Sequence, residues 1–210
     1  MRPTFMLNLL GLSLAACGAA PEGRSAEAAS DNAVSVPVVG ETPAPTAAPA
    51  AANLRLSGAA SAASIAAAEA SATRNGWSDV KASQAQSFRL VAGEREVAAL
   101  VTGEATLAPD VPGCFAGVVQ NDRVVLVPTI GQGEYETTAC GGPVAAGILR
   151  AGAPAAIGVI FKSYSPNAES LEPIAFTWDV ANNRFTIDAE RSKRASLAGA
   201  QSIADMQRAL

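Results

Sequence analysis

The chain has 210 residues, of which 49% are hydrophobic and 16% charged, and its 15 basic and 19 acidic side chains give a formal net charge of −4. An acidic balance without a basic cluster excludes the electrostatic footprint of a nucleic-acid-binding protein. Histidine is absent, which excludes Ser-His and Cys-His nucleophile pairs, imidazole metal ligands and a histidine pH switch.

Residues 1–18 carry an export pattern. Arg2 precedes a short apolar stretch from Phe5 to Leu14, and the segment ends in Leu14-Ala15-Ala16-Cys17. A basic start followed by an apolar run too short to span a bilayer is typical of a cleaved signal peptide. The ending resembles the lipobox of bacterial lipoprotein precursors, a family in which the bond before the cysteine is cut and that cysteine is acylated.

This resemblance covers residues 1–18 only. It implies a signal peptide at 1–16, lipidation at Cys17 and a place in the bacterial cell envelope, with the remaining chain facing the periplasm or the cell surface. In enterobacteria, a residue other than aspartate after the cysteine favours the outer membrane over the inner one, and Gly18 stands there. The alternatives are an ordinary secretory signal cut near Ala16 or a buried N-terminal helix.

The next segment, 17–52, is predicted to be a disordered tether behind the acylated cysteine. It consists mainly of Ala, Pro, Ser, Gly and Thr, a composition that buries too little apolar surface to order itself. Its five prolines also interrupt any helix that alanine would favour. Loss of residues 1–16 leaves 14 basic and 19 acidic side chains, a formal charge of −5. Without a polybasic run, membrane attachment rests on the lipid.

Residues 53–210 are predicted to form one globular domain, beginning with a helix over 57–74 that Gly76 terminates. Strands are expected at 88–92 and 96–102, with a turn at Gly93 between them. A hairpin follows, in which strands 114–120 and 123–127 are joined by Asn121-Asp122, because these two residue types tolerate the positive φ of tight turns.

The second half of the domain continues this pattern. A short helix is expected over 143–150, with proline at its start, and a central strand over 156–164. A second hairpin joins 174–180 to 184–187, and its alternation places Ile174, Phe176 and Trp178 on a core face and the intervening residues in solvent. Helical spacing predicts a last helix over 196–210 that buries against the sheet. The fold class is therefore α+β: an antiparallel twisted sheet of about five to seven strands, with helices on one face and a C-terminal helix.

Two cysteines remain if Cys17 is acylated. In an exported chain an even remainder is read as a disulfide, so Cys114 and Cys140 are predicted to pair. A redox pair or thiolate metal site requires clustered spacing such as Cys-x-x-Cys, which these residues lack. No metal and no cofactor are expected.

One short pattern suggests catalysis. Ser78-Asp79-Val80-Lys81 and Ser165-Pro166-Asn167 resemble two of the three elements of the penicillin-recognising serine enzymes. The resemblance implies a nucleophile at Ser78 and an activating base at Lys81, one helical turn away. The third element, Lys-Thr/Ser-Gly, is absent. The alternative is a serine at a helix start beside a solvated lysine and, at 165–167, a turn.

A second catalytic hypothesis rests on Glu134 and Glu136. Two carboxylates two positions apart would share one face of a strand, where they could share a proton or bind a cation. The glycine-rich surroundings favour a solvated sheet edge instead.

These observations favour a non-catalytic binding or structural domain in a membrane-anchored envelope lipoprotein. Its expected partners are the membrane, through the N-terminal lipid, and an envelope protein, an envelope polymer or a small ligand, but not nucleic acid. The rival hypothesis is an envelope hydrolase that uses Ser/Lys or paired-carboxylate chemistry.

Overall fold

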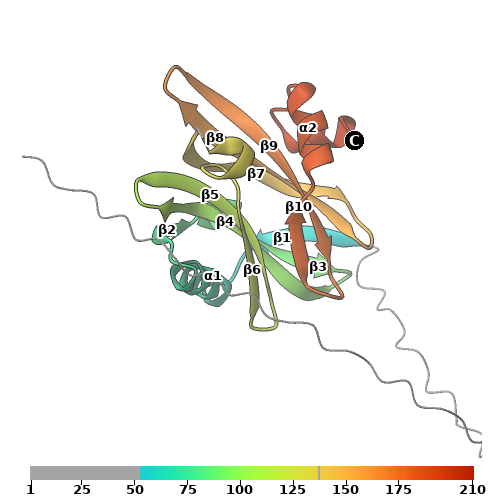
Figure 1. The fold of residues 1–210 in the computed structure, drawn as a ribbon. Helices are drawn as coiled ribbons and strands as arrows, with labels where there is room; N and C mark the ends of the chain where they lie inside the picture. Colours follow the sequence, from blue (N-terminus) through green and yellow to red (C-terminus); the bar gives the residue numbers. More distant parts are fainter. Residues whose placement is uncertain (1–52, 137) are drawn as a thin grey trace, which may run out of the picture. The chain divides into compact units, whose positions relative to one another are not determined.

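The structure, a computed structural model, describes residues 53–136 and 138–210. The predicted signal peptide, Cys17 and the predicted tether lie outside the described residues. Within them the chain forms two antiparallel sheets and three α-helices (Figure 1). The α+β class, the antiparallel pairing and the helical C-terminal segment are confirmed.

The first sheet has six strands in the order β1-β3-β4-β5-β6, with β2 paired to β4. Its strands are β1 (Leu54–Ala59), β2 (Ser78–Ala82), β3 (Phe88–Ala92), β4 (Arg95–Ala108), β5 (Val111–Gln120) and β6 (Arg123–Pro128). The second sheet has four strands in the order β10-β9-β8-β7. They are β7 (Ala139–Arg150), β8 (Ala155–Ser165), β9 (Ala168–Asp179) and β10 (Arg184–Ile187).

The two sheets bury one apolar face each in a common core. β4 and β5 contribute Leu100 and Val118 from the first sheet, and β8 and β9 contribute Phe161 and Trp178 from the second. All four side chains are fully buried. Trp178 is therefore a core residue, as predicted, and its indole N–H donates to Asn183 Oδ1 at 3.4 Å in the β9–β10 turn.

Helices cover the outer face of each sheet. α1 (Ala62–Arg74) packs its buried Ala68 and Ala72 inward, and Ala68 belongs to the same buried cluster as Val101 and Phe115 of the first sheet. α2 (Ala189–Leu197) and α3 (Ile203–Arg208) cover Ile160 and Ala175 of the second sheet. The expectation of one sheet with helices on one face is thus revised to two sheets with helices on both outer faces. The sequence places the residues that alternate with the core positions of β9 in solvent. One of them, Ala175, is instead fully buried under α2.

Both predicted hairpins are present. Asn121 and Asp122 have φ of 46° and 63° in the β5–β6 turn, and Asn183 has a φ of 46° in the β9–β10 connection. The predicted strands 88–92, 96–102 and 156–164 correspond to β3, β4 and β8.

Three predicted helices differ from the structure. The helix expected from 57 begins later, because Ser57 pairs with Arg89 in the first sheet and Ser61 caps α1 by accepting from Ser64 N–H at 3.1 Å. The segment 143–150 is not a helix but belongs to β7, which pairs with β8 through several irregularities, one of them between Cys140 and Pro143. Such bulges accommodate a proline that cannot donate to the ladder.

The helix expected over 196–210 is split. Gly199, with φ of 65°, ends α2, and Ser202 begins α3 by accepting from Asp205 N–H at 3.2 Å. As a result Leu197, whose helical spacing within 196–210 predicts burial against the sheet, is 79% exposed, whereas Met206, at the same spacing, is fully buried.

The predicted disulfide between Cys114 and Cys140 is present, with a Cα–Cα distance of 5.2 Å. It joins β5 of the first sheet to β7 of the second, and so crosslinks the two layers of the core. Disulfides persist in oxidising compartments, and the bond indicates an extracytoplasmic location. Among the residues that the structure describes, no helix combines the length and the apolar character needed to cross a membrane.

The crosslink provides a stability prediction. The double variant Cys114→Ala/Cys140→Ala should lose about 3.5 kcal/mol of unfolding free energy, because the unfolded chain is no longer restricted by the loop between the two residues. Guanidinium unfolding with and without reductant measures the loss. Reductant should destabilise the natural chain and leave the double variant unchanged; an unfolding midpoint that ignores reductant in both proteins would contradict the prediction.

Candidate functional site

The outer face of the second sheet is only partly covered by helices. Near α2 and α3 its residues are buried, as Ile160 and Ala175 show. Towards the β8–β9 turn the outer positions become accessible: Tyr164 is 41% exposed, and the side chains of Lys162 and Glu169 are 31% and 57% exposed. The described chain thus leaves one end of this sheet face open beside the helices.

Tyr164 and Lys162 lie next to each other on this open face. The Lys162 ammonium lies 5.3 Å from the centre of the Tyr164 ring. The ring also passes over β7 at Gly141, where a Cβ atom would come within 2.5 Å of Tyr164 Cε2. The missing side chain of Gly141 therefore gives the tyrosine ring its place on the sheet. We call the surface formed by Gly141, Lys162, Tyr164, Glu169 and Leu171 the platform.

The charges on the platform are paired. Lys162 Nζ lies 2.8 Å from Glu169 Oε1, and Tyr164 is the cross-strand partner of Glu169. The hydrogen bond to Glu169, followed by that to Tyr164, raises the pKa of Lys162, so its ammonium stays charged. The platform thus combines an exposed aromatic ring with a neutralised ion pair.

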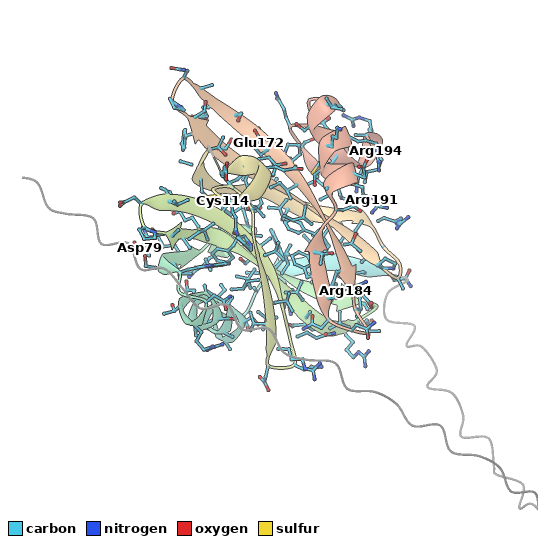
Figure 2. All side chains as sticks on the ribbon, in the orientation of Figure 1. Asp79, Cys114, Glu172, Arg184, Arg191 and Arg194 are labelled. Carbon is cyan, nitrogen blue, oxygen red and sulfur yellow. A yellow bond between two sulfur atoms is a disulfide. The ribbon has the colours of Figure 1, made fainter. Side chains whose placement is uncertain are left out.

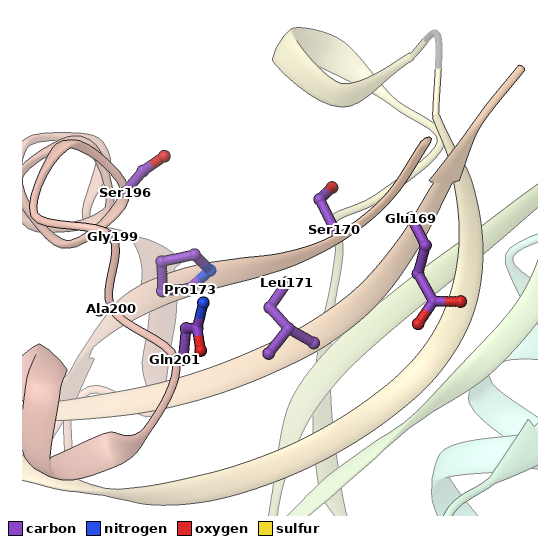
Figure 3. A pocket seen from close by; sticks show the side chains of 8 residues that line it. All are labelled: Glu169, Ser170, Leu171, Pro173, Ser196, Gly199, Ala200 and Gln201. Carbon is purple, nitrogen blue, oxygen red and sulfur yellow. The ribbon is translucent and has the colours of Figure 1, made fainter. Parts of the chain in front are cut away.

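A groove of about 370 Å³ adjoins the platform, between β9 and the α2–α3 connection (Figure 3). It shares Glu169 and Leu171 with the platform. The residues that line it are Glu169, Ser170, Leu171, Pro173, Ser196, Gly199, Ala200 and Gln201. Most of its polar groups are hydroxyl and amide groups.

Two contacts hold α2 in the position that forms this groove. Ser192, which is buried, accepts from Ala175 N–H of β9 at 2.9 Å. Asp188 caps α2 by accepting from Arg191 N–H at 3.0 Å, also pairs with the Arg191 guanidinium, and accepts from Thr177 Oγ1 at 3.2 Å. Arg191 and Arg194 mark the outer side of this helix in Figure 2.

The electrostatics of Asp188 follow from these contacts. Burial by itself would raise the pKa of this carboxyl, but the Arg191 N–H, the Arg191 charge and hydrogen bonds from Arg191 and Thr177 outweigh it. The net effect lowers the pKa of Asp188 below its ordinary value of 3.8. The carboxylate is therefore stabilised in the folded chain.

Ser170, which lines the groove, also belongs to a polar cluster that reaches the inner face at the same end of the sheet. Ser163, fully buried, shares a hydrogen bond of 2.8 Å with Ser170, whose hydroxyl donates to Glu172 at 3.0 Å. Burial, and then the charges of Glu172 and Glu134, raise the pKa of Tyr135, so its phenol is neutral. Because Ser163 is shielded from solvent, this cluster is a structural link between β8 and β9.

The Ser-x-x-Lys residues do not form the expected constellation. Ser78 and Lys81 lie on the exposed strand β2 and not on a helix, and the register of β2 on β4 shifts between them. Ser78 Oγ donates to its neighbour Asp79 at 3.4 Å, and Asp79 itself has φ of 51°. Ser165 bonds to Ala168 O at 3.3 Å in the β8–β9 turn. Each serine is thus accounted for by a local turn or strand contact.

The carboxylate pair is also differently placed. Glu134 and Glu136 lie in or next to the short 3₁₀ segment η3 (Gly133–Tyr135), not on a strand, and both are exposed. Within the described part of the chain, no group of three or more His, Cys, Asp or Glu side chains could hold a metal ion.

A second groove, of about 360 Å³, lies between α1 and the β5–β6 turn. Its lining consists of small residues of α1, the strand residues Val97 and Val119, and the polar tips Glu96, Asn121 and Asp122. None of the described aromatic side chains lines it. Among the described residues, its carboxylates Glu96 and Asp122 form no ion pair, whereas Glu169 pairs with Lys162. The platform and its groove are therefore the better candidate site.

Comparison of the chain with protein-family models, curated proteins and solved structures finds no match.

The sequence did not predict Ser196 and Gln201 as site residues, and it did not distinguish Tyr164 from the other aromatic residues, which could line a groove but more often lie in a core. One signal was present: Tyr164 is a large aromatic residue at the end of an apolar strand, followed at once by the turn Ser165-Pro166-Asn167. Aromatic residues at strand ends next to turns reach solvent more readily than those at mid-strand. Ser196 and Gln201 gave no such signal, because their position depends on how α2 docks.

We predict that Asp188→Ala loosens α2 and lowers the unfolding free energy by about 1–2 kcal/mol at neutral pH, since a helix cap and an ion pair are lost together. A carboxylate with a lowered pKa contributes stability above its ordinary pKa, and this contribution disappears as the pH falls through the folded value. The difference between variant and natural chain should therefore shrink at pH 3. Urea unfolding at the two pH values tests this, with Glu94→Ala, at an exposed position in the β3–β4 turn, as control; an equal difference at both would contradict it.

Proposed function

We propose that this protein is a lipid-anchored component of the bacterial cell envelope whose domain at 53–210 binds a ligand without transforming it. The observation that carries the proposal is the Cys114–Cys140 disulfide, which crosslinks the two sheets and leaves Cys17 as the one remaining cysteine of the sequence. A disulfide at the centre of the domain favours export, and the lipobox-like ending supplies both the export signal and an acylation site.

The proposed membrane anchor is a lipid on Cys17. Acylation at Cys17 and cleavage after Ala16 would leave a mature chain held by several acyl chains, and each buried methylene adds about 0.8 kcal/mol to membrane binding. Gly18 supports the outer membrane over the inner one, with the domain facing the periplasm or the cell surface.

The binding role is supported by the geometry of the candidate sites. The open platform and groove present an aromatic ring, hydroxyls and an amide on a fixed sheet. The Ser78 and Lys81 side chains of the rival hydrolase hypothesis lie instead on an exposed strand without the helical turn that would bring amine and hydroxyl together.

We predict that Cys17→Ala abolishes incorporation of labelled palmitate and shifts the protein from the membrane fraction to the aqueous fraction of cells. The matched control is Cys114→Ala/Cys140→Ala, in which Cys17 is the one cysteine left and labelling should persist. Mass spectrometry of the natural protein should show an acylated residue 17 at the amino terminus. An intact, unmodified Met1 terminus would refute the anchoring proposal.

The Ser/Lys form of the hydrolase alternative predicts a covalent acyl-enzyme. We expect the natural chain to remain unlabelled by a fluorescent penicillin under conditions that label a control penicillin-binding protein. Labelling that disappears in both Ser78→Ala and Lys81→Ala, but persists in Ser83→Ala, would establish the hydrolase and overturn the binding proposal.

A further inference from the structure

We infer that the platform and the adjoining groove form a binding site for an uncharged glycan strand of the cell envelope. This inference rests on the proposed function and names the class of ligand that the proposed function leaves open. Three features of the site support it: an exposed aromatic ring, free hydroxyl and amide groups, and the absence of unpaired charge on the platform.

The aromatic feature is Tyr164. Sugar rings present one C–H-rich face, and amphipathic aromatic side chains offer an apolar surface with a polar edge that fits such a face. Tyr164 as a residue remains 41% exposed although its ring leans over β7, and Gly141 leaves the space in which the ring does so. Its neighbours on the platform fix the ring from one side, through the Lys162 ammonium at 5.3 Å.

The polar feature is the far wall of the groove. Ser196 of α2 and Gln201 of the α2–α3 connection line the side of the groove opposite β9 (Figure 3). Among the described residues, neither the Ser196 hydroxyl nor the side-chain amide of Gln201 has a hydrogen-bond partner. Of Gln201, only the backbone N–H is bound, and it donates to the Asp205 carboxylate at 3.2 Å. A hydroxyl donates and accepts, and a carboxamide does both at separate atoms. These groups match the hydroxyl and acetamido groups of sugars.

The charge on the site selects against other ligands. Glu169 is the acidic group that the platform and the groove share, and Lys162 neutralises it at 2.8 Å. An anionic polymer would need an unpaired cation, and a cationic ligand would need an unpaired carboxylate. A neutral ligand rich in hydroxyl groups needs neither, and it can still accept and donate hydrogen bonds at the exposed edges of the ion pair.

The extent of the site favours a polymer over a monosaccharide. From Glu169 to Pro173 the groove follows β9 for four residue steps, which is about 13 Å at the rise of a strand. The platform extends the contact surface further, from β9 to Tyr164 on β8 and Gly141 on β7. A contact surface of this extent accommodates more than one unit of a strand.

The test uses the full chain, purified from membranes in detergent, and three insoluble probes: peptidoglycan, whose peptide stems are charged but whose glycan strands are the proposed ligand, and the neutral glycans chitin and cellulose. We expect saturable co-sedimentation with at least one of them. Because the contacts are uncharged, binding should change less than about twofold between low and high salt. Retention by none of the three, or binding that collapses in high salt, would refute the inference.

Variants locate the site. Tyr164→Ala should weaken binding about tenfold, because an aromatic contact is lost, and Tyr164→Phe should retain most of the affinity because its ring remains. Gln201→Ala should weaken binding as well. Asp122→Ala, in the groove beside α1, is the matched control and should bind like the natural chain. Equal binding by Tyr164→Ala and Asp122→Ala, at unchanged circular dichroism and melting temperature, would overturn the assignment.

The failure of this inference is distinguishable from failure of the proposed function. If palmitate labelling at Cys17 is present and no glycan is retained, the chain is an envelope lipoprotein and the glycan site is wrong. If labelling is absent, the anchoring proposal is wrong whatever the glycan assay shows.

Discussion

The arrangement of this domain depends on the contact between the inner faces of its two sheets. Trp178, Phe161 and Phe176 of the second sheet are fully buried against Leu100 and Val118 of the first. Neither sheet could expose such a face to water, because each large apolar side chain contributes about 1.5–3 kcal/mol on burial. The helices follow from this contact: with the inner faces paired, each outer face needs a cover of its own.

The disulfide lies inside this contact and gives it a second kind of restraint. Cys114 is fully buried on β5, while Cys140 lies at an irregular part of β7, where Gly142 N–H donates to its sulfur at 3.2 Å. Hydrophobic burial fixes which faces meet but tolerates small slides of one sheet over the other. A covalent link between one position on each sheet removes that freedom. It also fixes the end of β7 over which the Tyr164 ring leans. Figure 2 shows Cys114 among the core side chains.

The sequence predicted the local structure where the chain carries an unambiguous local signal. Asn121 and Asp122 predicted a tight turn, and the alternation around Trp178 predicted a strand with one core face. Prediction failed where tertiary contacts decide. Residues 143–150 have a composition that suits a helix, yet β8 captures them as a strand. The division into two sheets escaped prediction, because a period of two shows that a strand has a buried face and not which other strand covers it.

The candidate site could not be predicted for a related reason: its two walls come from different layers of the fold. β9 and the α2–α3 connection are separated in sequence by the β9–β10 turn, β10 and α2 itself. They meet because Ser192 and Asp188 hold α2 against β9, and because the chain turns at Gly199 so that Met206 can bury over β8. The turn that returns the chain to the sheet is the same turn that brings Gln201 to the rim of the groove. The candidate site is thus a consequence of covering the second sheet with two short helices, α2 and α3, and not with one continuous helix.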